Sequence, residues 1–409
     1  MRSPILISSF LLALACSTAS VGAGPQADTT TVFLGARIID GTGSDPIGDG
    51  ALVVRNGRID AVGPRSAVSI PPNAEEIDLS GKTVMPGIFN AHGHANQNPE
   101  DILRLFARYG VTTVVSLGND SSALAALHDA QDTASLDRAR LYFAGQVSGA
   151  PSQAIARVGQ LAEAGADWVK IRLDGGRGAS DAGYRQVVDR AHTLGLRVAA
   201  HIYTLEDARR VLEHGIDLVG HSVRDREVDA GLTALFHEKD ACISPTLTRE
   251  LSTFVYQSTP EFFSDPFFLR YANPQTVAGL GGGGGRGGFG GGGREDIEMA
   301  QTNLKILSDA GVGVALGTDS GASSNRFPGY FEHLEMELMV AAGLTPMEVI
   351  VSATGGAARC TGLDQDLGTL EAGKWADFLV LAANPLEDIA NTKTLESVWI
   401  AGSRVPDGD

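Results

Sequence analysis

The stretch Val84-Met-Pro-Gly-Ile-Phe-Asn-Ala-His-Gly-His94 has the pattern of a buried strand that ends in a short turn. Side chains two residues apart on a strand point to the same face, so His92 and His94 can direct both imidazoles at one point. Two neutral imidazoles at a strand end suit Zn²⁺ and similar ions. Histidines are also common in turns and on surfaces, so any further ligands must come from later in the chain.

Beyond this stretch, strand-like runs alternate with amphipathic helix-like runs. We expect strands at 84–90, 111–117, 140–147, 168–173, 197–202, 218–222, 242–247 and 313–319. Helices are expected at 99–109, 121–131, 153–164, 181–194, 205–214, 228–239 and 295–310, followed by 330–342 and 346–353. Several of these helices run into a glycine before the next strand, as in Tyr109-Gly and Leu194-Gly, which suits a left-handed cap.

Eight strand-then-helix units predict an α/β fold, a (β/α)₈ TIM barrel, with polar residues at the strand ends forming the site. A doubly wound open sheet is the alternative, but no Gly-x-Gly-x-x-Gly fingerprint follows the first strand.

Short β-rich runs with Asp-Gly and Asn-Gly turns occupy residues 31–83, and similar runs occupy 373–382 and 397–402. Both termini are therefore expected to build one small β-sandwich. The predicted division is an export signal at 1–24, sandwich parts at 25–83 and 363–409, and the barrel at 84–362.

A glycine-rich stretch at 279–293 interrupts the barrel pattern after the seventh strand. Glycine loses more conformational entropy on ordering than any other residue, so the stretch is either a tolerated flexible insertion or a mobile lid over the site. Seven aromatic residues precede it: Phe254, Tyr256, Phe262, Phe263, Phe267, Phe268 and Tyr271. These rings would suit an apolar or aryl group of a substrate.

The chain has 409 residues and a net charge of −17, which argues against nucleic-acid binding because that requires a basic surface. Arg2, an apolar run at 5–15 and small residues up to Ala23 are typical of an export signal. We expect a soluble protein that is periplasmic or secreted, with a lipoprotein anchored through Cys16 as the alternative. No later segment is expected to span a membrane.

Cys242 and Cys360 remain if Cys16 is removed with the signal. Two cysteines make no disulfide framework, and both are interpreted as small core residues.

Few polar residues fall at the predicted strand ends. His92 and His94 follow the first strand, Lys170 lies in the fourth, and His201, His221 and Asp319 end the fifth, sixth and eighth. A buried ammonium is costly unless it is paired. Lys170 is therefore expected to form a salt bridge or to react with CO₂, giving an anionic carbamate that can bridge two cations.

The chain resembles the amidohydrolase superfamily over about residues 31–405, and within it the imidazolonepropionase-like and Xaa-Pro dipeptidase-like branch. The resemblance is carried by Pro86-Gly-Ile-Phe-Asn-Ala-His-Gly-His94, Gly165-Ala-Asp-Trp-Val-Lys170, Ala200-His-Ile-Tyr203, Gly215-Ile-Asp-Leu-Val-Gly-His221, Gly317-Thr-Asp319 and Leu367-Gly-Thr-Leu-Glu-Ala-Gly-Lys-Trp-Ala-Asp377.

The resemblance implies two divalent ions, with Zn²⁺ expected. His92, His94 and Asp319 would hold the more buried ion, His201 and His221 the more exposed one, and carboxylated Lys170 would bridge both. A hydroxide held between the ions would attack the carbonyl of an amide, and Asp319 would pass its proton to the leaving nitrogen. The family usually has Asp where this chain has Asn90, and little effect is expected because that residue is not a ligand.

Two further residues are candidate substrate contacts. Tyr203 follows a predicted ligand and could donate a hydrogen bond, or it could only pack. Arg224 could bind a substrate carboxylate, with an ion pair to Asp225 as the structural alternative. His333, which opens a helix, is expected to pack rather than to line the site.

The predicted function is therefore hydrolysis of an amide bond in a small molecule or short peptide, by a dipeptidase, carboxypeptidase or N-acyl amino acid amidohydrolase. A mononuclear deaminase or cyclic-amide hydrolase of the imidazolonepropionase type is the alternative, although a one-metal site needs no bridging Lys170. A metal-binding protein without turnover is the third hypothesis, which the complete ligand set disfavours. A homo-oligomer is left open.

Overall fold

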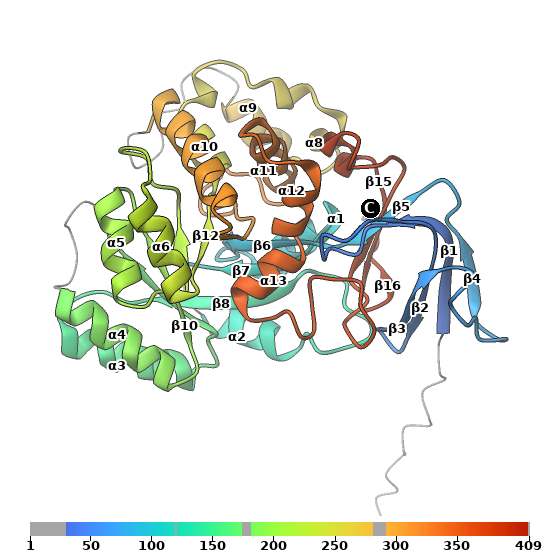
Figure 1. Cartoon of the computed structure of the whole chain (residues 1–409), viewed down its shortest axis with the longest axis horizontal. Coiled ribbons are helices and arrows are strands. Elements are labelled where there is room, and N and C mark those ends of the chain that lie inside the picture. The colour runs from blue at the N-terminus through green and yellow to red at the C-terminus, as the bar shows by residue number, and fades with distance from the viewer. Residues whose placement is uncertain (1–29, 119–120, 174–180, 281–291, 408–409) are drawn as a thin grey trace, which may run out of the picture.

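The computed structural model describes residues 30–118, 121–173, 181–280 and 292–407. The predicted export signal and most of the glycine-rich stretch at 279–293 lie outside the described residues. Two sheets organise the described chain (Figure 1). One is parallel and packed against helices, and the other combines strands from both ends of the chain.

Eight strands form the parallel sheet in simple chain order, from β6 at one edge to β13 at the other. They are β6 (Ile88–Gly93), β7 (Val111–Ser116), β8 (Arg140–Gln146), β9 (Trp168–Arg172), β10 (Arg197–His201), β11 (Leu218–Gly220), β12 (Cys242–Ser244) and β13 (Gly313–Val314). Each predicted barrel strand overlaps one of these, so the alternation of buried runs and amphipathic runs locates the strands correctly.

Helices connect the strands and cover the outer face of the sheet (Figure 1). They are α1 (Pro99–Arg108), α2 (Ser122–Asp129), α3 (Pro151–Glu163), α4 (Asp181–Thr193), α5 (Leu205–Glu213), α6 (Ala230–Lys239), α10 (Arg294–Asp309), α11 (Tyr330–Ala341), α12 (Pro346–Ser352) and α13 (Gly355–Thr361). The expected glycine caps are confirmed, for example at Gly110 and Gly195, where φ is 90° and 77°.

The sheet curls so that its two edges approach each other. No regular ladder joins β13 to β6 in the described chain, but the segment after β13 bonds to β6 through its backbone. Ala91 N donates to Leu316 O at 2.8 Å, and Asp319 N donates to His92 O at 2.7 Å. The predicted barrel is thus present as a curled parallel sheet whose edges meet through these bonds.

Strands from both termini form the second sheet, in the order β16-β15-β14-β5-β1-β2-β3, with β4 beside β1. They are β1 (Thr30–Ile38), β2 (Ile47–Arg55), β3 (Arg58–Pro64), β4 (Glu75–Asp78), β5 (Thr83–Pro86), β14 (Phe378–Leu381), β15 (Leu395–Ile400) and β16 (Ser403–Arg404). The expected union of the two termini is present, as one sheet that branches at β1 rather than as two separate facing sheets.

The predicted first barrel strand, 84–90, is divided between the two sheets at Gly87. β5 pairs with β1 and β14, whereas β6 pairs with β7. A Cβ at Gly87 would lie 2.1 Å from Thr112 Oγ1, so only glycine allows the chain to pass this close to β7. β5 and β6 look like a single strand in the sequence because both are buried along their whole length.

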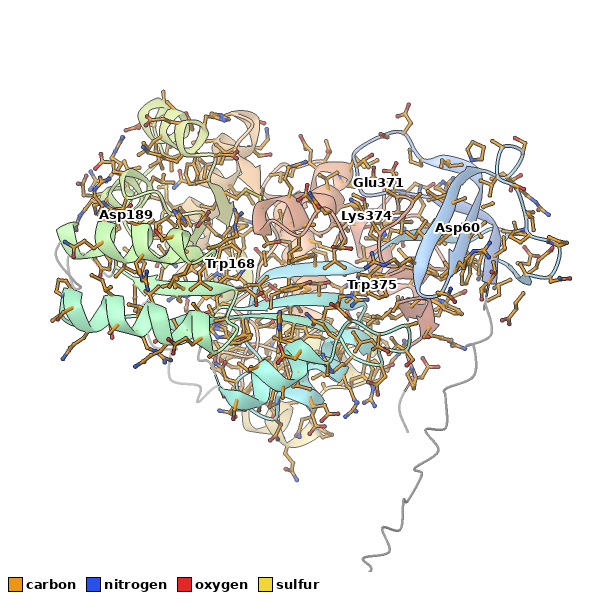
Figure 2. All side chains as sticks on the ribbon, turned by 90° about the horizontal axis from the view of Figure 1, so that it is seen from below. Asp60, Trp168, Asp189, Glu371, Lys374 and Trp375 are labelled. Carbon is orange, nitrogen blue, oxygen red and sulfur yellow. A yellow bond between two sulfur atoms is a disulfide. The ribbon has the colours of Figure 1, made fainter. Side chains whose placement is uncertain are left out.

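The two sheets are joined by a charged and aromatic contact around Trp375, which lies where they meet (Figure 2). The guanidinium carbons of Arg58 and Arg140 lie 4.1 and 4.4 Å from the Trp375 ring centroid. Arg140 Nε also donates to Asp377 Oδ2 at 2.7 Å, and both side chains are buried. This pairing compensates two charges that would otherwise be expensive to bury.

The chain between β12 and α10 contains α7 (Leu247–Leu251), η1 (Val255–Gln257), η2 (Glu261–Ser264), α8 (Pro266–Leu269) and α9 (Pro274–Leu280). Its aromatic rings pack mainly on each other and on α11: Phe262 and Phe268 lie 5.3 Å apart, and Phe268 lies 5.0 Å from Tyr330. Most of the aromatic run therefore forms a local core, and the expectation that it serves a substrate group is wrong for most of its members.

None of the helices in the described ranges is long and apolar enough to cross a membrane.

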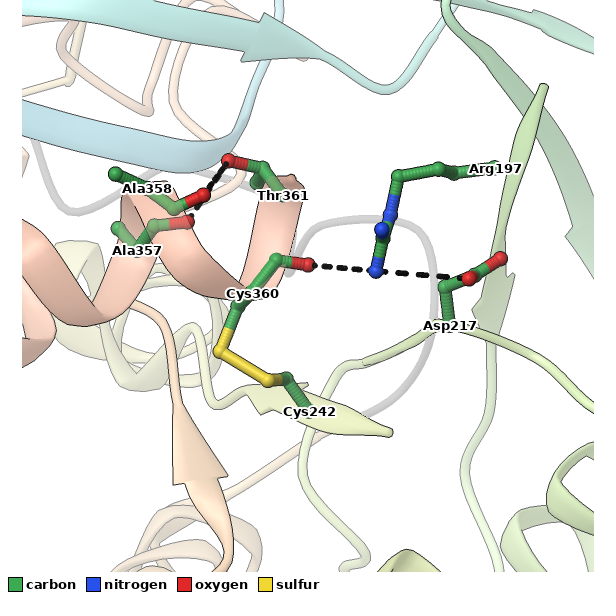
Figure 3. Close-up of a disulfide and its surroundings, with 7 residues drawn as sticks. All are labelled: Arg197, Asp217, Cys242, Ala357, Ala358, Cys360 and Thr361. Atoms are coloured by element: carbon green, nitrogen blue, oxygen red, sulfur yellow. Dashed lines mark hydrogen bonds and ion pairs between the residues drawn. A yellow bond between two sulfur atoms is a disulfide. The ribbon is translucent and has the colours of Figure 1, made fainter. Parts of the chain in front are cut away.

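Cys242 and Cys360 form a disulfide with a Cα–Cα separation of 5.7 Å, which corrects the expectation that they are unpaired core residues (Figure 3). The bond ties β12 to α13 across 118 positions of sequence. Arg197 lies beside it, donating to Cys360 O at 3.2 Å and pairing with Asp217 at 3.5 Å. Spacing alone could not reveal the bond because the two cysteines are brought together by the curl of the sheet.

Replacing both cysteines, Cys242→Ser with Cys360→Ser, should lower the free energy of unfolding by roughly 2–5 kcal/mol, because the bond restricts a long loop in the unfolded chain. Urea unfolding of the variant and of the wild type, each with and without dithiothreitol, measures this. Dithiothreitol should shift only the wild type. If dithiothreitol left the urea midpoint of the wild type unchanged, the disulfide would be contradicted.

Candidate metal centre

The six predicted ligands come together at one end of the parallel sheet. They lie at or just after the carboxyl ends of their strands, and all line one cavity of about 630 Å³: His92, His94, Lys170, His201, His221 and Asp319. They are all buried. Parallel strands that curl into a ring direct their carboxyl ends to the same rim, so residues scattered over the sequence become neighbours.

His92 lies at the middle of the group. Its Nε2 is 3.2 Å from Lys170 Nζ and 3.6 Å from Asp319 Oδ1. Its ring stacks on that of His221 at a centroid distance of 4.7 Å. Ligand atoms of His92, His221 and Asp319 all lie within 4.8 Å of one another.

The other two imidazoles extend the group on either side. His94 Nε2 is 2.7 Å from Asp319 Oδ1, and His201 Nδ1 is 2.9 Å from His221 Nε2. His221 Nδ1 is 2.6 Å from Thr246 Oγ1, a contact that orients the ring. Nearest-neighbour contacts thus run from His201 to His221, from His221 to His92, and on to Asp319 and His94.

Burial and neighbouring charge set the protonation of these side chains. Burial lowers the pKa of His92 and His221 well below the usual value, and nearby cationic groups lower it further. Both imidazoles are therefore neutral and keep a lone pair near neutral pH. Burial alone would raise the pKa of Asp319, but Arg326 and then His94 outweigh it and hold the pKa far below its usual value. Asp319 is therefore an anion.

Among the described residues, no carboxylate forms a salt bridge with Lys170. Burial lowers the pKa of Lys170 to about 7, opposed by Asp319 and assisted by Arg172. The salt bridge that the sequence left open as an explanation of Lys170 is not found among its described contacts, of which the closest is His92.

The donor set fits divalent transition ions. Neutral imidazole nitrogens and a carboxylate are the ligands that Zn²⁺ binds in proteins. His92 Nδ1 is buried without a hydrogen-bond partner among the described residues, whereas its Nε2 faces Lys170 and Asp319. Asp319 has a left-handed backbone with φ of 56°, a conformation that costs about 1–2 kcal/mol for a non-glycine residue and is common at functional sites.

The two predicted substrate contacts lie outside the cavity lining. Arg224 is completely buried, pairs with Glu250 and donates to Ile202 O at 2.7 Å. The expected structural partner, Asp225, pairs instead with Arg226. Tyr203 lies under the Arg224 guanidinium at 4.7 Å and bonds to Asp296. A direct substrate contact at Arg224 is therefore not supported by its position.

Three arginines that the sequence analysis missed do line the cavity: Arg172, Arg249 and Arg326. Arg249 follows β12 and donates to both Glu250 oxygens at 2.8 Å. Arg326 follows the last strand and pairs with Asp319 Oδ2. Arg249 lies two residues past the predicted strand 242–247, which was an available signal, whereas Arg326 lies seven residues past the predicted strand 313–319. Tyr256 also lines the cavity and donates to Asn325 O.

His333 packs away from the site, as expected. Its ring nitrogens lie 2.9 Å from Thr392 Oγ1 and 2.7 Å from Tyr109 O. Burial lowers its pKa to about 4, which keeps the ring neutral.

Comparison with known proteins shows similarity over nearly the whole described chain. Residues 83–405 match the amidohydrolase family. Imidazolonepropionase of Deinococcus radiodurans is 26% identical over 390 residues, covering 88% of this chain and 92% of that protein. Imidazolonepropionase of Deinococcus deserti is 41% identical over 103 residues, about a quarter of each protein (24% and 25%).

A solved structure from Bifidobacterium longum, provisionally assigned as a prolidase, superposes with a TM-score of 0.75. It is 27% identical and covers 92% of this chain and 94% of its own. The family match spans most of the sequence, and the similar structure covers both sheets. The chain therefore belongs to the amidohydrolase family of hydrolytic enzymes.

Proposed function

We propose that this protein hydrolyses amide bonds in small substrates that carry a carboxylate, such as dipeptides or N-acyl amino acids, with two divalent ions held by the six side chains. His92, His94 and Asp319 would hold one ion, and His201 and His221 would hold the other. Lys170, as its carbamate, would supply a further anionic ligand to both. Zn²⁺ is the expected metal because the donors are imidazole and carboxylate.

The position of Lys170 is the single observation that carries the proposal. Its Nζ lies in a buried group of imidazoles, 3.2 Å from His92 Nε2. Burial that lowers its pKa to about 7 leaves much of the amine uncharged near neutral pH, as reaction with CO₂ requires. The amine nitrogen bonds to the carbon of CO₂ and loses a proton, giving an anionic carbamate beside His92.

The ions would lower the pKa of a water between them and polarise the substrate carbonyl. Asp319 is an anion whose Oδ1 faces the imidazoles and whose Oδ2 is held by Arg326. It is placed to accept the proton of the attacking water and to return it to the leaving nitrogen, which departs as an amine. His221 is oriented by Thr246 and keeps its ring fixed during these transfers.

A carboxylate on the substrate fits the charge of the cavity wall. Arg224 and Arg249 share one buried carboxylate, Glu250, so this trio carries a net charge of +1. Arg249 is the member that reaches the cavity. We therefore assign to Arg249 the anion-binding role that the sequence analysis had considered for Arg224.

A cyclic-amide hydrolase or deaminase that uses one ion is the alternative, favoured by the similarity to imidazolonepropionase along most of the chain. The two functions differ in what they require of Lys170, because a single ion needs no bridging anion.

The protein is proposed to act outside the cytoplasm, as a periplasmic or secreted enzyme. The Cys242–Cys360 disulfide supports this, because such bonds persist mainly in oxidising compartments.

If Lys170 carries a carbamate, a negatively charged replacement at this position should retain more metal than a positively charged one. Lys170→Arg keeps the positive charge and should lose activity by ~100-fold or more together with one of two bound ions. Lys170→Glu restores a carboxylate and should retain more metal than Lys170→Arg. Metal analysis of the purified variants and kcat/KM against dipeptides, N-acyl amino acids, lactams and aryl amides measure both effects.

Lys305→Arg, on an exposed face of α10, is the matched control and should change neither quantity. Metal content near two ions per wild-type chain is expected. One ion per chain, or a Lys170→Arg variant with full metal and activity, would favour the one-metal alternative.

Removal of the Arg249 charge should weaken binding of anionic substrates. Arg249→Met is expected to raise KM for a free-carboxylate substrate by roughly 10–100-fold, the worth of a charged hydrogen bond. The same substrate with its carboxylate amidated should be hydrolysed equally by both proteins. Arg226→Met, at an exposed position nearby, is the control. An equal KM increase for both substrate forms would contradict a carboxylate contact.

A further inference from the structure

Asn90 lies two residues before His92 and is completely buried. Its Oδ1 accepts a hydrogen bond from His92 N at 2.9 Å, so one end of the amide holds the backbone of a proposed metal ligand. Its Nδ2 donates to Glu332 Oε1 at 2.5 Å and lies 3.0 Å from Thr318 Oγ1. The amide thus uses both its acceptor and its donor within the protein.

Glu332 projects from the first turn of α11 and is equally buried. Three donors converge on its Oε1: Asn90 Nδ2 at 2.5 Å, Ser320 Oγ at 2.6 Å and Thr318 Oγ1 at 2.8 Å. Thr318 and Ser320 are the two neighbours of Asp319 in sequence. One carboxylate oxygen therefore connects the strand that carries His92 to the segment that carries Asp319.

This connection lies at the point where the curled sheet is joined edge to edge. Thr318 N and Asp319 N both donate to His92 O, at 3.1 and 2.7 Å. Asp319 has a left-handed backbone there, and such a conformation persists only when its surroundings hold it. Glu332 supplies that support, because it binds a side chain on each side of Asp319.

We propose that Asn90 and Glu332 form a coupled positioning pair that fixes the backbones of His92 and Asp319 relative to each other. Neither residue contacts the ions or the substrate. The inference concerns the same centre as the proposed function and rests on it only for the metal measurement. It revises the expectation that the residue at position 90 matters little.

The coupling follows from hydrogen-bond complementarity. Glu332 Oε1 is an acceptor only, so its partner at position 90 must donate, and an amide does. Aspartate there would place two acceptors about 2.5 Å apart in a site without water access. Exchange of the two groups, Asn90→Asp with Glu332→Gln, would restore one donor and one carboxylate with the direction reversed.

The experiment is a double-mutant cycle on Asn90→Asp, Glu332→Gln and the exchanged double variant. Thermal unfolding of the metal-free proteins and Zn²⁺ affinity by competition with a chelator are the two measurements. Asn90→Asp should lower Tm by ~5 °C or more and weaken Zn²⁺ binding by roughly 10–100-fold, as loss of groups that orient ligands does. The exchanged variant should return to within about threefold of wild-type Zn²⁺ affinity and should recover most of the Tm.

Glu335→Gln is the matched control, because Glu335 lies one turn further along α11 and is equally buried. It accepts from Leu247 N and Thr248 N and touches neither Asn90 nor Asp319. This variant should lower Tm without changing Zn²⁺ affinity, and it should not rescue Asn90→Asp.

The proposed coupling would be overturned if the two substitutions had additive effects on Tm and Zn²⁺ affinity, or if Asn90→Asp changed neither quantity. Recovery of Tm with Zn²⁺ affinity unaffected in every variant would overturn the positioning role. A wild-type protein that binds no Zn²⁺ would count against the proposed function and against positioning, while the metal-free Tm cycle would still decide whether positions 90 and 332 are coupled.

Discussion

The site depends on a pair of backbone hydrogen bonds that His92 O accepts. The carbonyl binds Thr318 N and Asp319 N, and so links the first strand of the curled sheet to the segment after the last. Together with the bonds from Ala91 N to Leu316 O and from His94 N to Ser320 O, this link closes the arc of the sheet and places Asp319 beside the imidazoles. A local geometric constraint, imposed by closing the curl, therefore creates a charged centre from residues that are distant in sequence.

The same closure buries the six side chains, which makes their electrostatics demanding. Several buried charges are paired, at the centre Asp319 with Arg326 and Glu250 with Arg224 and Arg249, and between the two sheets Arg140 with Asp377. His92 and His221 avoid the need for a charged partner, since burial lowers the pKa of both and leaves these two imidazoles neutral. Imidazole nitrogens beside one carboxylate are the donor set that divalent transition ions prefer, which makes this cluster a candidate metal centre.

Sequence reasoning located the strands, the glycine caps and the clustering of the six polar residues, because each depends on local periodicity or on strand order. It failed where partners are chosen by three-dimensional proximity. The Cys242–Cys360 bond and the Arg224–Glu250 pair join residues that no local pattern relates. Gly87 was missed for another reason: two buried strands in series look like one, and only the close approach of Thr112 shows where the chain changes sheets.

The proposed chemistry and the proposed specificity rest on physically separate supports. The ligand side chains lie at the ends of strands, where backbone bonds and the Asn90–Glu332 contact hold them. Arg249 and Arg326 lie on the long connections that follow, which are held together by the aromatic core of α8, η2 and α11. Since Tyr256 links these connections through Asn325, packing changes in this core can move Arg249, whereas Arg326 is held by its pair with Asp319. Variation in substrate preference is therefore expected to arise in the aromatic core before it arises at the metal centre.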